Sequence, residues 1–215
     1  MKEALTLDDF LVVLRNINTT VQVNAVFLCQ LDSVVGDGDH GTTLARGLGK
    51  SIDAITTTPS VTISELFLTV GKTMISSMGG ASGPIFGSLF KEMGRASKGL
   101  EVVTLADLYT MFSKAASKVQ KLGKAEPGDK TLLDSLLPGI DSLAESVEYS
   151  TDFVESLQKM AQAAKTGVEA TKEMIAKKGR ARYAGERGIG HQDAGATSIY
   201  LMLQSFADTV AELGE

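Results

Sequence analysis

The segment Leu31–Gly47, with the sequence LDSVVGDGDHGTTLARG, is the most informative part of the chain. It places Asp32, Asp37 and Asp39 within eight residues, with glycines between them. Two carboxylates about 5 Å apart repel by roughly 3 kcal/mol at an effective dielectric constant of about 20, so a folded cluster of three needs a compensating cation. Because hard oxygen ligands favour Mg²⁺ or Ca²⁺, the segment predicts a divalent-metal site in a loop.

The residues directly after the acidic cluster, His40, Gly41, Thr42 and Thr43, predict the first turn of a helix. A helix N-terminus presents unpaired N–H groups and the positive end of the helix dipole to an anion. Glycine also lets the backbone approach a ligand closely, because it has no Cβ. Carboxylates for a cation beside N–H groups for an anion indicate a metal-bound phosphate, such as a nucleotide with Mg²⁺.

Three known motifs and a plain turn fit this segment less well. Its glycines match G-x-G-x-x-G, but the strand that a dinucleotide-binding unit requires does not precede them. An EF-hand that starts at Asp37 would need glutamate where Leu48 stands. Gly49–Ser51 resembles the end of a P-loop, but Leu44 occupies the position of its first glycine. A turn with helix-capping aspartates explains one or two of the acidic residues and not the cluster.

The composition indicates one globular domain that spans residues 1–215. The chain is 43% hydrophobic and 22% charged, and its net charge of −5 argues against a general nucleic-acid binder. The one cysteine, Cys29, excludes an intramolecular disulfide, and its apolar neighbours predict a buried thiol. We find no signal peptide and no apolar run of about 20 residues, so we expect a cytoplasmic protein outside the membrane.

Apolar spacing predicts eight helical segments with short connections, and we find no period-2 strand or internal repeat. Asn16–Thr20 is expected to bend the first helix, and Pro138 is expected to kink or divide the sixth. Thr151–Asp152 is expected to open a long seventh helix. The predicted helices span residues 6–31, 40–55, 62–79, 84–93, 104–122, 132–147, 151–176 and 196–213.

The order of the glycine-bearing turns places the site. Turns at Gly36–Gly41, at Gly79–Gly83 and near Gly123 follow alternate helices. In an up-down bundle, alternate connections lie at the same end. The sequence therefore predicts an all-α, eight-helix antiparallel bundle with a nucleotide site on one rim, where the loop before the last helix joins the other three.

Two further segments of this rim can be interpreted in two ways. Gly79–Pro84 opens a helix and is suited to a phosphate, but glycine, serine and proline also make plain helix connections. The basic stretch Lys177–Gly190 is either a solvated loop or an anion clamp, because arginine matches phosphate oxygens in geometry.

Four motifs together resemble the DhaL-type nucleotide-binding subunit of dihydroxyacetone kinase, and the resemblance covers nearly the whole chain. The motifs are LDSVVGDGDHG from Leu31, GGASGPIFG from Gly79, GDKTLLDSLLP from Gly128 and RARYAGERGIGHQDAGATS from Arg180. The resemblance implies an eight-helix antiparallel barrel that holds ADP or ATP at one end through two Mg²⁺ ions.

The resemblance also implies roles for residues of this chain. The metal ligands would be Asp32, Asp37 and Asp39. The residues that contact the nucleotide would be His40, Gly41, Thr42, Thr43, Ala81, Ser82, Gly123, Leu132, Arg180, Asp193, Ala194 and Gly195. Among these, Gly123 and Leu132 would shape the adenine end, and Arg180 would act as a charged clamp. Ala194 departs from the family, which commonly has proline there.

This resemblance makes the chain half of a kinase. Residues that bind dihydroxyacetone would lie on a separate DhaK-type subunit, which would also supply the base for the acceptor hydroxyl. The chain itself would contribute no catalytic group beyond its metal and phosphate site. Either ATP is the exchanging donor, or ADP stays bound and a DhaM-type carrier of the phosphotransferase system rephosphorylates it.

Three alternatives stay open at this point. The same fold could serve a non-catalytic nucleotide sensor or regulatory subunit. It could also serve a kinase for another small ketose, such as a tetrulose. A metal-binding helical module without nucleotide is the third, and Arg180 and the Gly79–Gly83 turn argue against it. A second copy of the chain, in a homodimer, is a further candidate partner.

Overall fold

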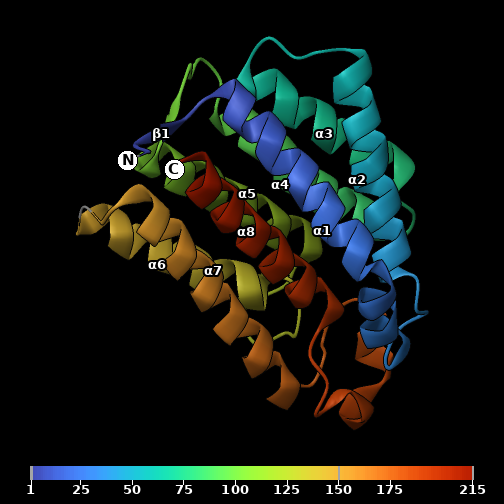
Figure 1. Cartoon of the computed structure of the whole chain (residues 1–215). Coiled ribbons are helices and arrows are strands. Elements are labelled where there is room, and N and C mark those ends of the chain that lie inside the picture. The colour runs from blue at the N-terminus through green and yellow to red at the C-terminus, as the bar shows by residue number, and fades with distance from the viewer. Residues whose placement is uncertain (1, 150, 215) are drawn as a thin grey trace.

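The computed structural model describes residues 2–149 and 151–214, and helices dominate this part of the chain (Figure 1). The α-helices are α1 (Leu7–Ser33), α2 (His40–Thr57), α3 (Ile63–Ser77), α4 (Ser82–Ala96), α5 (Leu105–Gly123), α6 (Leu133–Glu148), α7 (Phe153–Ala170) and α8 (Ala194–Leu213). Short 3₁₀ turns η1 (Thr171–Glu173), η2 (Ala181–Tyr183) and η3 (Gly185–Gly188) lie between α7 and α8.

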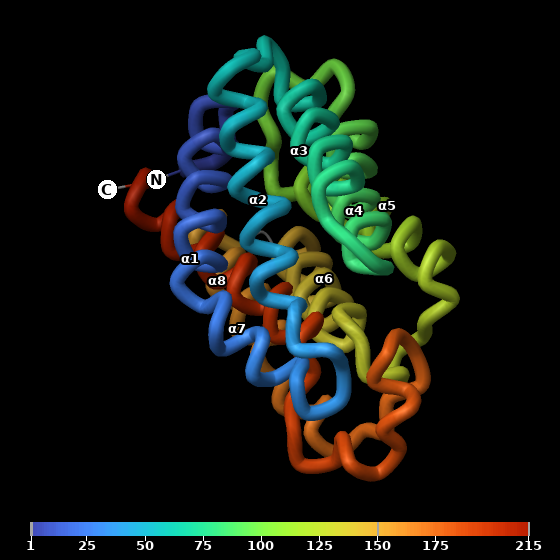
Figure 2. The backbone as a smooth tube through the Cα atoms, turned by 90° about the vertical axis from the view of Figure 1, so that its right-hand side faces the viewer, coloured from blue at the N-terminus to red at the C-terminus, as the bar shows by residue number. Residues whose placement is uncertain are grey.

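The helices form a closed up-down arrangement. Each helix packs against the next along the chain, and α8 packs against both α7 and α1, which completes the ring. Four connections therefore lie at one end, which we call the rim: those between α1 and α2, α3 and α4, α5 and α6, and α7 and α8. Figure 2 shows the α1–α2 loop and the long segment before α8 at its lower end. The predicted all-α, eight-helix bundle is confirmed.

The opposite end, which we call the closed end, is fixed by a pair of short strands. In it, β1 (Ala4–Leu5) pairs antiparallel with β2 (Val103–Thr104), and Leu5 lies opposite Val103. The residue after β1 and the last residue of β2 each begin a helix with a reciprocal capping box, Thr6 with Asp9 and Thr104 with Asp107. These strands were not predicted, because two residues are too few to show alternation.

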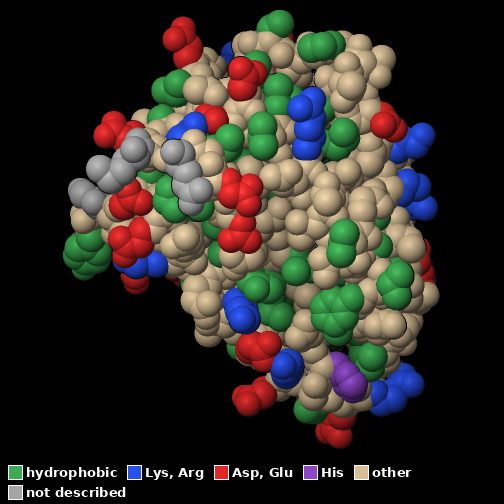
Figure 3. Space-filling view, viewed as in Figure 1, with side chains coloured by type: hydrophobic (Ala, Val, Ile, Leu, Met, Phe, Trp, Pro, Cys, Tyr) green, Lys and Arg blue, Asp and Glu red, His purple; other side chains and the backbone are tan. Residues whose placement is uncertain are grey.

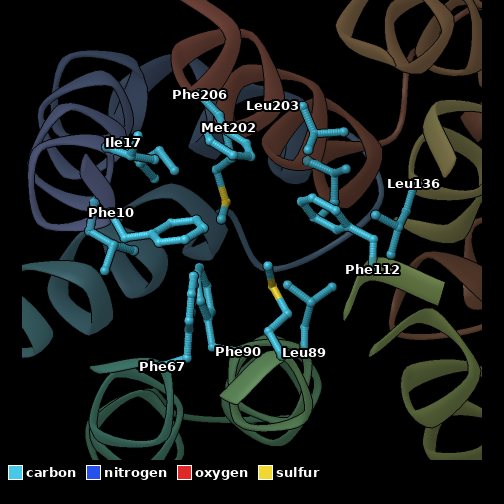
Figure 4. Close-up of a pocket in the computed structure, with 14 residues that line it drawn as sticks. Phe10, Ile17, Phe67, Leu89, Phe90, Phe112, Leu136, Met202, Leu203 and Phe206 are labelled. Carbon is cyan, nitrogen blue, oxygen red and sulfur yellow. The ribbon is translucent and has the colours of Figure 1, made fainter. Parts of the chain in front are cut away.

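The core lies inside the ring, where apolar faces of the helices converge. Figure 4 shows aromatic and aliphatic side chains from several helices pointing toward one centre. Phe10 and Phe67 meet edge to face at 5.1 Å between ring centroids, a favourable aromatic geometry. A cavity of about 40 Å³ remains between these side chains, and its lining is wholly apolar. Such a lining offers water no hydrogen-bond partner.

Pro138 does not divide the sixth helix, because α6 continues through it, and α1 runs without interruption through Asn16–Thr20. The bend expected at Asn16–Thr20 and a kink at Pro138 stay predictions. Proline removes the N–H that would bond the carbonyl of Asp134, and that carbonyl lies against Gly167 of α7, where a Cβ would collide with it. A neighbouring helix thus fills the space beside the interrupted bond.

The seventh helix also differs from the prediction. It ends at Ala170 rather than residue 176, because the chain tightens into η1 at that point. Its N-cap is Asp152, whose carboxylate accepts the N–H groups of Val154 and Glu155. Thr151 was expected to share this role and does not cap the helix.

Helix α1 is long and apolar enough to cross a membrane by length and composition, and no other helix in the described part of the chain is. Length and composition alone carry little weight, because core helices of globular proteins share them. In this structure α1 packs along α2 and α8 as one wall of the ring.

Candidate functional site

Three carboxylates meet at the rim, as the sequence predicts. Asp32 lies in the last turn of α1, Asp37 in the following loop, and Asp39 directly before α2. One oxygen of each lies within 4.8 Å of the others. The Asp39 N–H donates to Asp32 Oδ2 at 3.1 Å, so the loop folds back over the end of α1. Glycine at position 36 lets the loop pass close to Asp32, since a Cβ there would meet the present position of its carboxylate.

The backbone of Asp39 explains why its carboxylate belongs to this cluster. Asp39 is the N-cap of α2, but its dihedrals are helical (φ −110°, ψ −1°) and its side chain makes no capping hydrogen bond. Typical N-cap residues have extended dihedrals, which let the side chain turn back to the helix. The Asp39 carboxylate therefore does not cap α2 and stays with the carboxylates of Asp32 and Asp37.

One cation already reaches the cluster. Arg180, from the segment between α7 and α8, places Nη1 2.6 Å from Asp37 Oδ2. The two residues are far apart in sequence and meet because both connections lie at the rim. The guanidinium partly offsets the repulsion among the three carboxylates.

An open cavity of about 270 Å³ lies between the rim connections. Most of the predicted site residues line it: Asp32, Asp37, Asp39, His40, Ala81, Ser82, Leu132, Arg180, Asp193, Ala194 and Gly195. Gly41, Thr42, Thr43 and Gly123 do not line it. Charged side chains of both signs surround this end of the molecule in Figure 3.

The residues outside the lining have other contacts. Gly41 permits the close approach of α2 to α1, since a Cβ there would collide with the Ala25 carbonyl. The N–H of Thr42 donates to Cys29 Sγ at 3.4 Å, and the N–H of Thr43 bonds Asp39 O at 2.9 Å. The start of α2 thus uses these two donors within the protein. Cys29 itself is half-buried, not buried as expected.

Gly123, the last residue of α5, lies one layer behind the cavity. A Cβ at this position would lie 3.5 Å from Cδ1 of Ile85, and Ile85 lines the cavity. Gly123 therefore affects the site through the isoleucine that packs on it.

His40 forms part of the cavity wall rather than a free base. Its Nε2 lies 2.7 Å from Ser198 Oγ, and its ring packs against Phe86 at 5.9 Å between centroids. Burial lowers the pKa of His40, although the charges of Asp32 and Asp39 act in the opposite direction. The imidazole links α2 to α8 and lines the cavity between them.

The α3–α4 turn brings a second helix N-terminus to the cavity. Gly80 has φ +64°, a left-handed conformation that suits glycine. Ala81 precedes α4 and gives no side-chain cap, so the first N–H groups of α4 receive no capping bond. An uncapped helix start is suited to an anion.

Asp193 stands at the start of α8. Its Oδ2 accepts the Ala196 N–H at 2.7 Å. Burial raises the pKa of Asp193 to about 6; the Ala196 N–H lowers it, the nearby Asp134 raises it further, and Lys130 lowers it. This carboxylate is held in place by the helix that it caps.

Lys130 is the main residue of the cavity that the sequence patterns did not identify. It is 3% exposed, and burial lowers its pKa. Its Nζ donates to the carbonyl oxygens of Gly188 and Met174 at 2.6 and 3.2 Å. The motif that begins at Gly128 contains this lysine, but nothing local indicates its distant partners.

These features define a class of protein: an all-α ring whose rim brings together a cluster of three carboxylates, helix N-termini and an arginine around one cavity. A model of the DAK2 domain family matches residues 34–208 of the chain. The chain belongs to the DAK2 domain family and, within it, to the DhaL-type subunits.

Similar proteins include the ADP-binding subunit DhaL of the PEP-dependent dihydroxyacetone kinase of Escherichia coli (strain K12). It is 41% identical over 181 residues, which are 84% of this chain and 86% of that protein. The corresponding subunit of the PTS-dependent kinase of Lactococcus lactis is 33% identical over 96% of this chain and 100% of its own length. The L-erythrulose kinase of Pectobacterium atrosepticum is 31% identical, but this chain covers 32% of it.

The solved structures agree on the fold. The dihydroxyacetone kinase of C. freundii superposes with a TM-score of 0.71 at 24% identity, over 96% of this chain and 35% of that one. The same kinase in complex with AMP-PNP and Mg²⁺ gives a TM-score of 0.70 over 91% of this chain and 33% of that one. This chain thus corresponds to about a third of that longer kinase.

Proposed function

We propose that this chain is the ADP- or ATP-binding subunit of a dihydroxyacetone kinase and that residues 1–215 act as one domain. The observation that carries the proposal is the rim cavity, where the carboxylates of Asp32, Asp37 and Asp39 face Arg180 and the uncapped start of α4. Relatives named as ADP-binding subunits, similar over most of both chains, support the same function.

The donor chemistry of the acidic cluster fits Mg²⁺. Three carboxylates converge within 4.8 Å, and hard oxygen ligands are what this ion takes. Asp32, Asp37 and Asp39 would hold it, with two ions as the fuller proposal. The ion would supply positive charge to offset the negative charge that develops during phosphoryl transfer.

Other residues of the rim would hold the nucleotide. The first N–H groups of α4, after Ala81, face the cavity and would bind phosphate oxygens. Arg180 would move its guanidinium from Asp37 to phosphate, because arginine pairs with phosphate in two-point geometry. His40 and Asp193–Gly195 would complete the walls around the phosphates.

The adenine end would lie where the cavity is apolar. Leu132 lines it beside Ile85, and Gly123 packs behind that isoleucine. We propose that the base rests on these side chains. Gly41, Thr42 and Thr43 would then act mainly by placing the start of α2, since their contacts are with α1 and with Asp39.

The acceptor would come on a second protein. His40 is half-buried and its Nε2 is paired with Ser198 Oγ, so we do not propose it as the base for a substrate hydroxyl. We propose a DhaK-type subunit that carries dihydroxyacetone and the base, and a DhaM-type phosphoryl carrier as the donor to bound ADP. A cytoplasmic location agrees with these partners, and a homodimer is a further candidate assembly.

Reconstitution tests this function. The purified chain is mixed with a DhaK-type subunit, dihydroxyacetone and Mg²⁺, with either ATP or the phosphotransferase proteins and phosphoenolpyruvate. We expect dihydroxyacetone phosphate with one of the two donors, and ADP in the mass spectrum of the native protein if the carrier is the donor. Bound nucleotide without transfer from either donor would contradict a kinase subunit and favour the regulatory alternative.

A ketose of four carbons is the second candidate acceptor. The resemblance to an L-erythrulose kinase favours it, although that protein is about three times longer than the matched region. The same assay with erythrulose in place of dihydroxyacetone separates the two substrates. Because the acceptor would bind the partner, the preference should follow the partner used and not this chain.

A further inference from the structure

The turn between α5 and α6 belongs to a motif of which the proposed function uses only Leu132. The Asp134 carboxylate holds it, accepting the N–H groups of Gly128 and Thr131 at 2.5 and 2.7 Å. Within it Lys130 has φ +59°, a left-handed conformation that is costly for a residue with a side chain. Such a conformation persists where the surroundings fix it, and it often marks a functional position.

The side chain of Lys130 joins two distant parts of the chain. Its ammonium donates to the carbonyls of Met174 and Gly188, which are 44 and 58 residues away in sequence. These residues bound the segment that carries Arg180, so one nitrogen holds both ends of it. A buried ammonium needs such acceptors, and removing it would take one hydrogen bond from each carbonyl, although the Gly188 carbonyl also accepts the His191 N–H at 3.3 Å.

Asp129, the neighbour of Lys130, adds contacts to the same segment. Its backbone carbonyl accepts the Lys177 N–H at 3.0 Å. Its carboxylate lies 3.3 Å from the ammonium of Lys177 and 3.8 Å from that of Lys178. The two lysine side chains are exposed, so these ion pairs contribute little compared with the backbone bond.

Arg180 itself is not fixed by its surroundings. Its side chain is 68% exposed, and its described partner is Asp37. A long exposed side chain loses rotamer entropy when it is held in one place. The placement of its backbone must therefore come from the ends of the segment, where the α5–α6 turn makes its contacts.

We propose that Lys130 is a positioning residue that holds the segment from Met174 to Gly188 against the α5–α6 turn and so sets Arg180 over the acidic cluster. The lysine acts on the bound nucleotide through the arginine and not by direct contact. What Arg180 contacts in the complex rests on the proposed function, whereas the attachment of the segment does not.

The first test needs no nucleotide. Hydrogen exchange is followed in EDTA for the wild type, for Lys130→Met, and for Lys124→Met as a matched control. Lys124 also has a left-handed backbone conformation (φ +49°) and is the C-cap of α5, but its side chain is exposed. We expect at least about tenfold faster exchange at residues 174–190 in Lys130→Met alone, with α1 and α2 unchanged.

Trypsin reports on the same segment, which contains Lys177, Lys178, Arg180, Arg182 and Arg187. Cleavage there should be faster in Lys130→Met, and Lys130→Arg should restore much of the protection. If Lys130→Met does not fold, as judged by its helical circular dichroism, Lys130→Gln replaces it with the same expectation. Unchanged exchange and cleavage in a folded variant would overturn the proposal.

The second test asks whether Lys130 affects nucleotide binding through Arg180 or independently of it. Mg²⁺·ADP affinity is measured for Lys130→Met, Arg180→Gln and the double variant. We expect each single change to weaken binding by about tenfold, and the double variant to bind no more weakly than Arg180→Gln alone. Additive losses would overturn the proposal. A wild type that does not bind Mg²⁺·ADP would contradict the proposed function and leave the exchange result standing.

Discussion

The two ends of the bundle start their helices in different ways. At the closed end, α1, α3, α5 and α7 begin after Thr6, Thr62, Thr104 and Asp152, and each of these side chains accepts a backbone N–H. At the rim, α2, α4 and α6 begin after Asp39, Ala81 and Leu132, and none of these N-cap side chains accepts an N–H. Side chains outside the cap position do so for two of the helices: Thr131 Oγ1 accepts the Leu133 N–H of α6, and Cys29 Sγ accepts the Thr42 N–H of α2. At the rim only α8 is capped by its N-cap side chain, that of Asp193.

Backbone conformation accounts for the difference. The closed-end caps have ψ between 144° and 174°, as capping requires, whereas Asp39, Ala81 and Leu132 have helical ψ between −1° and −24°. A side-chain cap is worth about 1 kcal/mol, so the rim forgoes stability that the closed end retains. The uncapped N–H groups at the start of α4 and the carboxylates of Asp32, Asp37 and Asp39 are what a metal-bound anion would use.

The largest effect on nucleotide binding is expected for a substitution in the carboxylate cluster at the rim. Asp37→Asn removes one of the three clustered carboxylates and the partner of Arg180. We expect Mg²⁺-dependent ADP binding to fall by more than about 100-fold in calorimetry, since even an outer-shell partner of a metal costs about 10- to 100-fold. Asp53→Asn, an exposed change on α2, is the control, and equal affinity in both variants would refute the metal role.

A substitution in the core should affect the stability of the protein and not its affinity for the nucleotide. Phe10 is buried beside the central cavity and contacts Phe67. Phe10→Ala should lower the free energy of unfolding by about 3–5 kcal/mol in urea titrations while leaving ADP affinity of the folded protein unchanged. Val61→Ala, at a side chain that is 79% exposed, should change it by less than about 0.5 kcal/mol.

Asp193 should make the stability of the protein depend on pH. Because folding raises its pKa from 3.8 to about 6, its stabilising contribution is full below about pH 3.8 and is lost as the pH rises through 6. The shift corresponds to about 3 kcal/mol. In metal-free buffer, Asp193→Asn should match the wild type near pH 4 and be more stable at pH 7.

The pH dependence reflects the groups that face Asp193. Asparagine can still accept the Ala196 N–H, so the cap is kept. Lys130 favours the charged form of Asp193, and Asp134 opposes it. A stability difference that does not change between pH 4 and pH 7 would show that this carboxylate titrates normally.

The smallest effect is expected at a closed-end cap. Asp152→Ala removes the acceptor of two N–H groups at the start of α7 and should cost about 1 kcal/mol. Thr151→Ala, one residue earlier, should cost much less. Thermal unfolding of both variants measures these losses of stability. A larger loss from Thr151→Ala than from Asp152→Ala would show that Thr151 caps the helix.

The features that could be predicted from the sequence depend on residues that are close together in the chain. Apolar spacing and glycine turns indicated the helices and, through their alternation, the rim on which Asp32, Asp37 and Asp39 gather. The close approach of Gly167 in α7 to the Asp134 carbonyl, which lies beside Pro138 in α6, joins two helices, and no local pattern shows it.

Long-range contacts also shape the site in ways that the sequence does not show. The Thr42 N–H is taken by Cys29 of α1, which no pattern around the threonine shows. The partners of Lys130 are backbone carbonyls, and these leave no trace in the side-chain sequence. Which helix ends are free therefore becomes visible only when the neighbouring elements are in place.

The most direct measurement is an anomalous difference map from crystals grown with Mn²⁺ and ADP. We predict metal density between Asp32, Asp37 and Asp39, phosphate against the start of α4, and Arg180 moved from Asp37 to the nucleotide. Metal density elsewhere, or a nucleotide bound away from the rim with the Arg180–Asp37 pair intact, would contradict a metal-anchored nucleotide site at the rim.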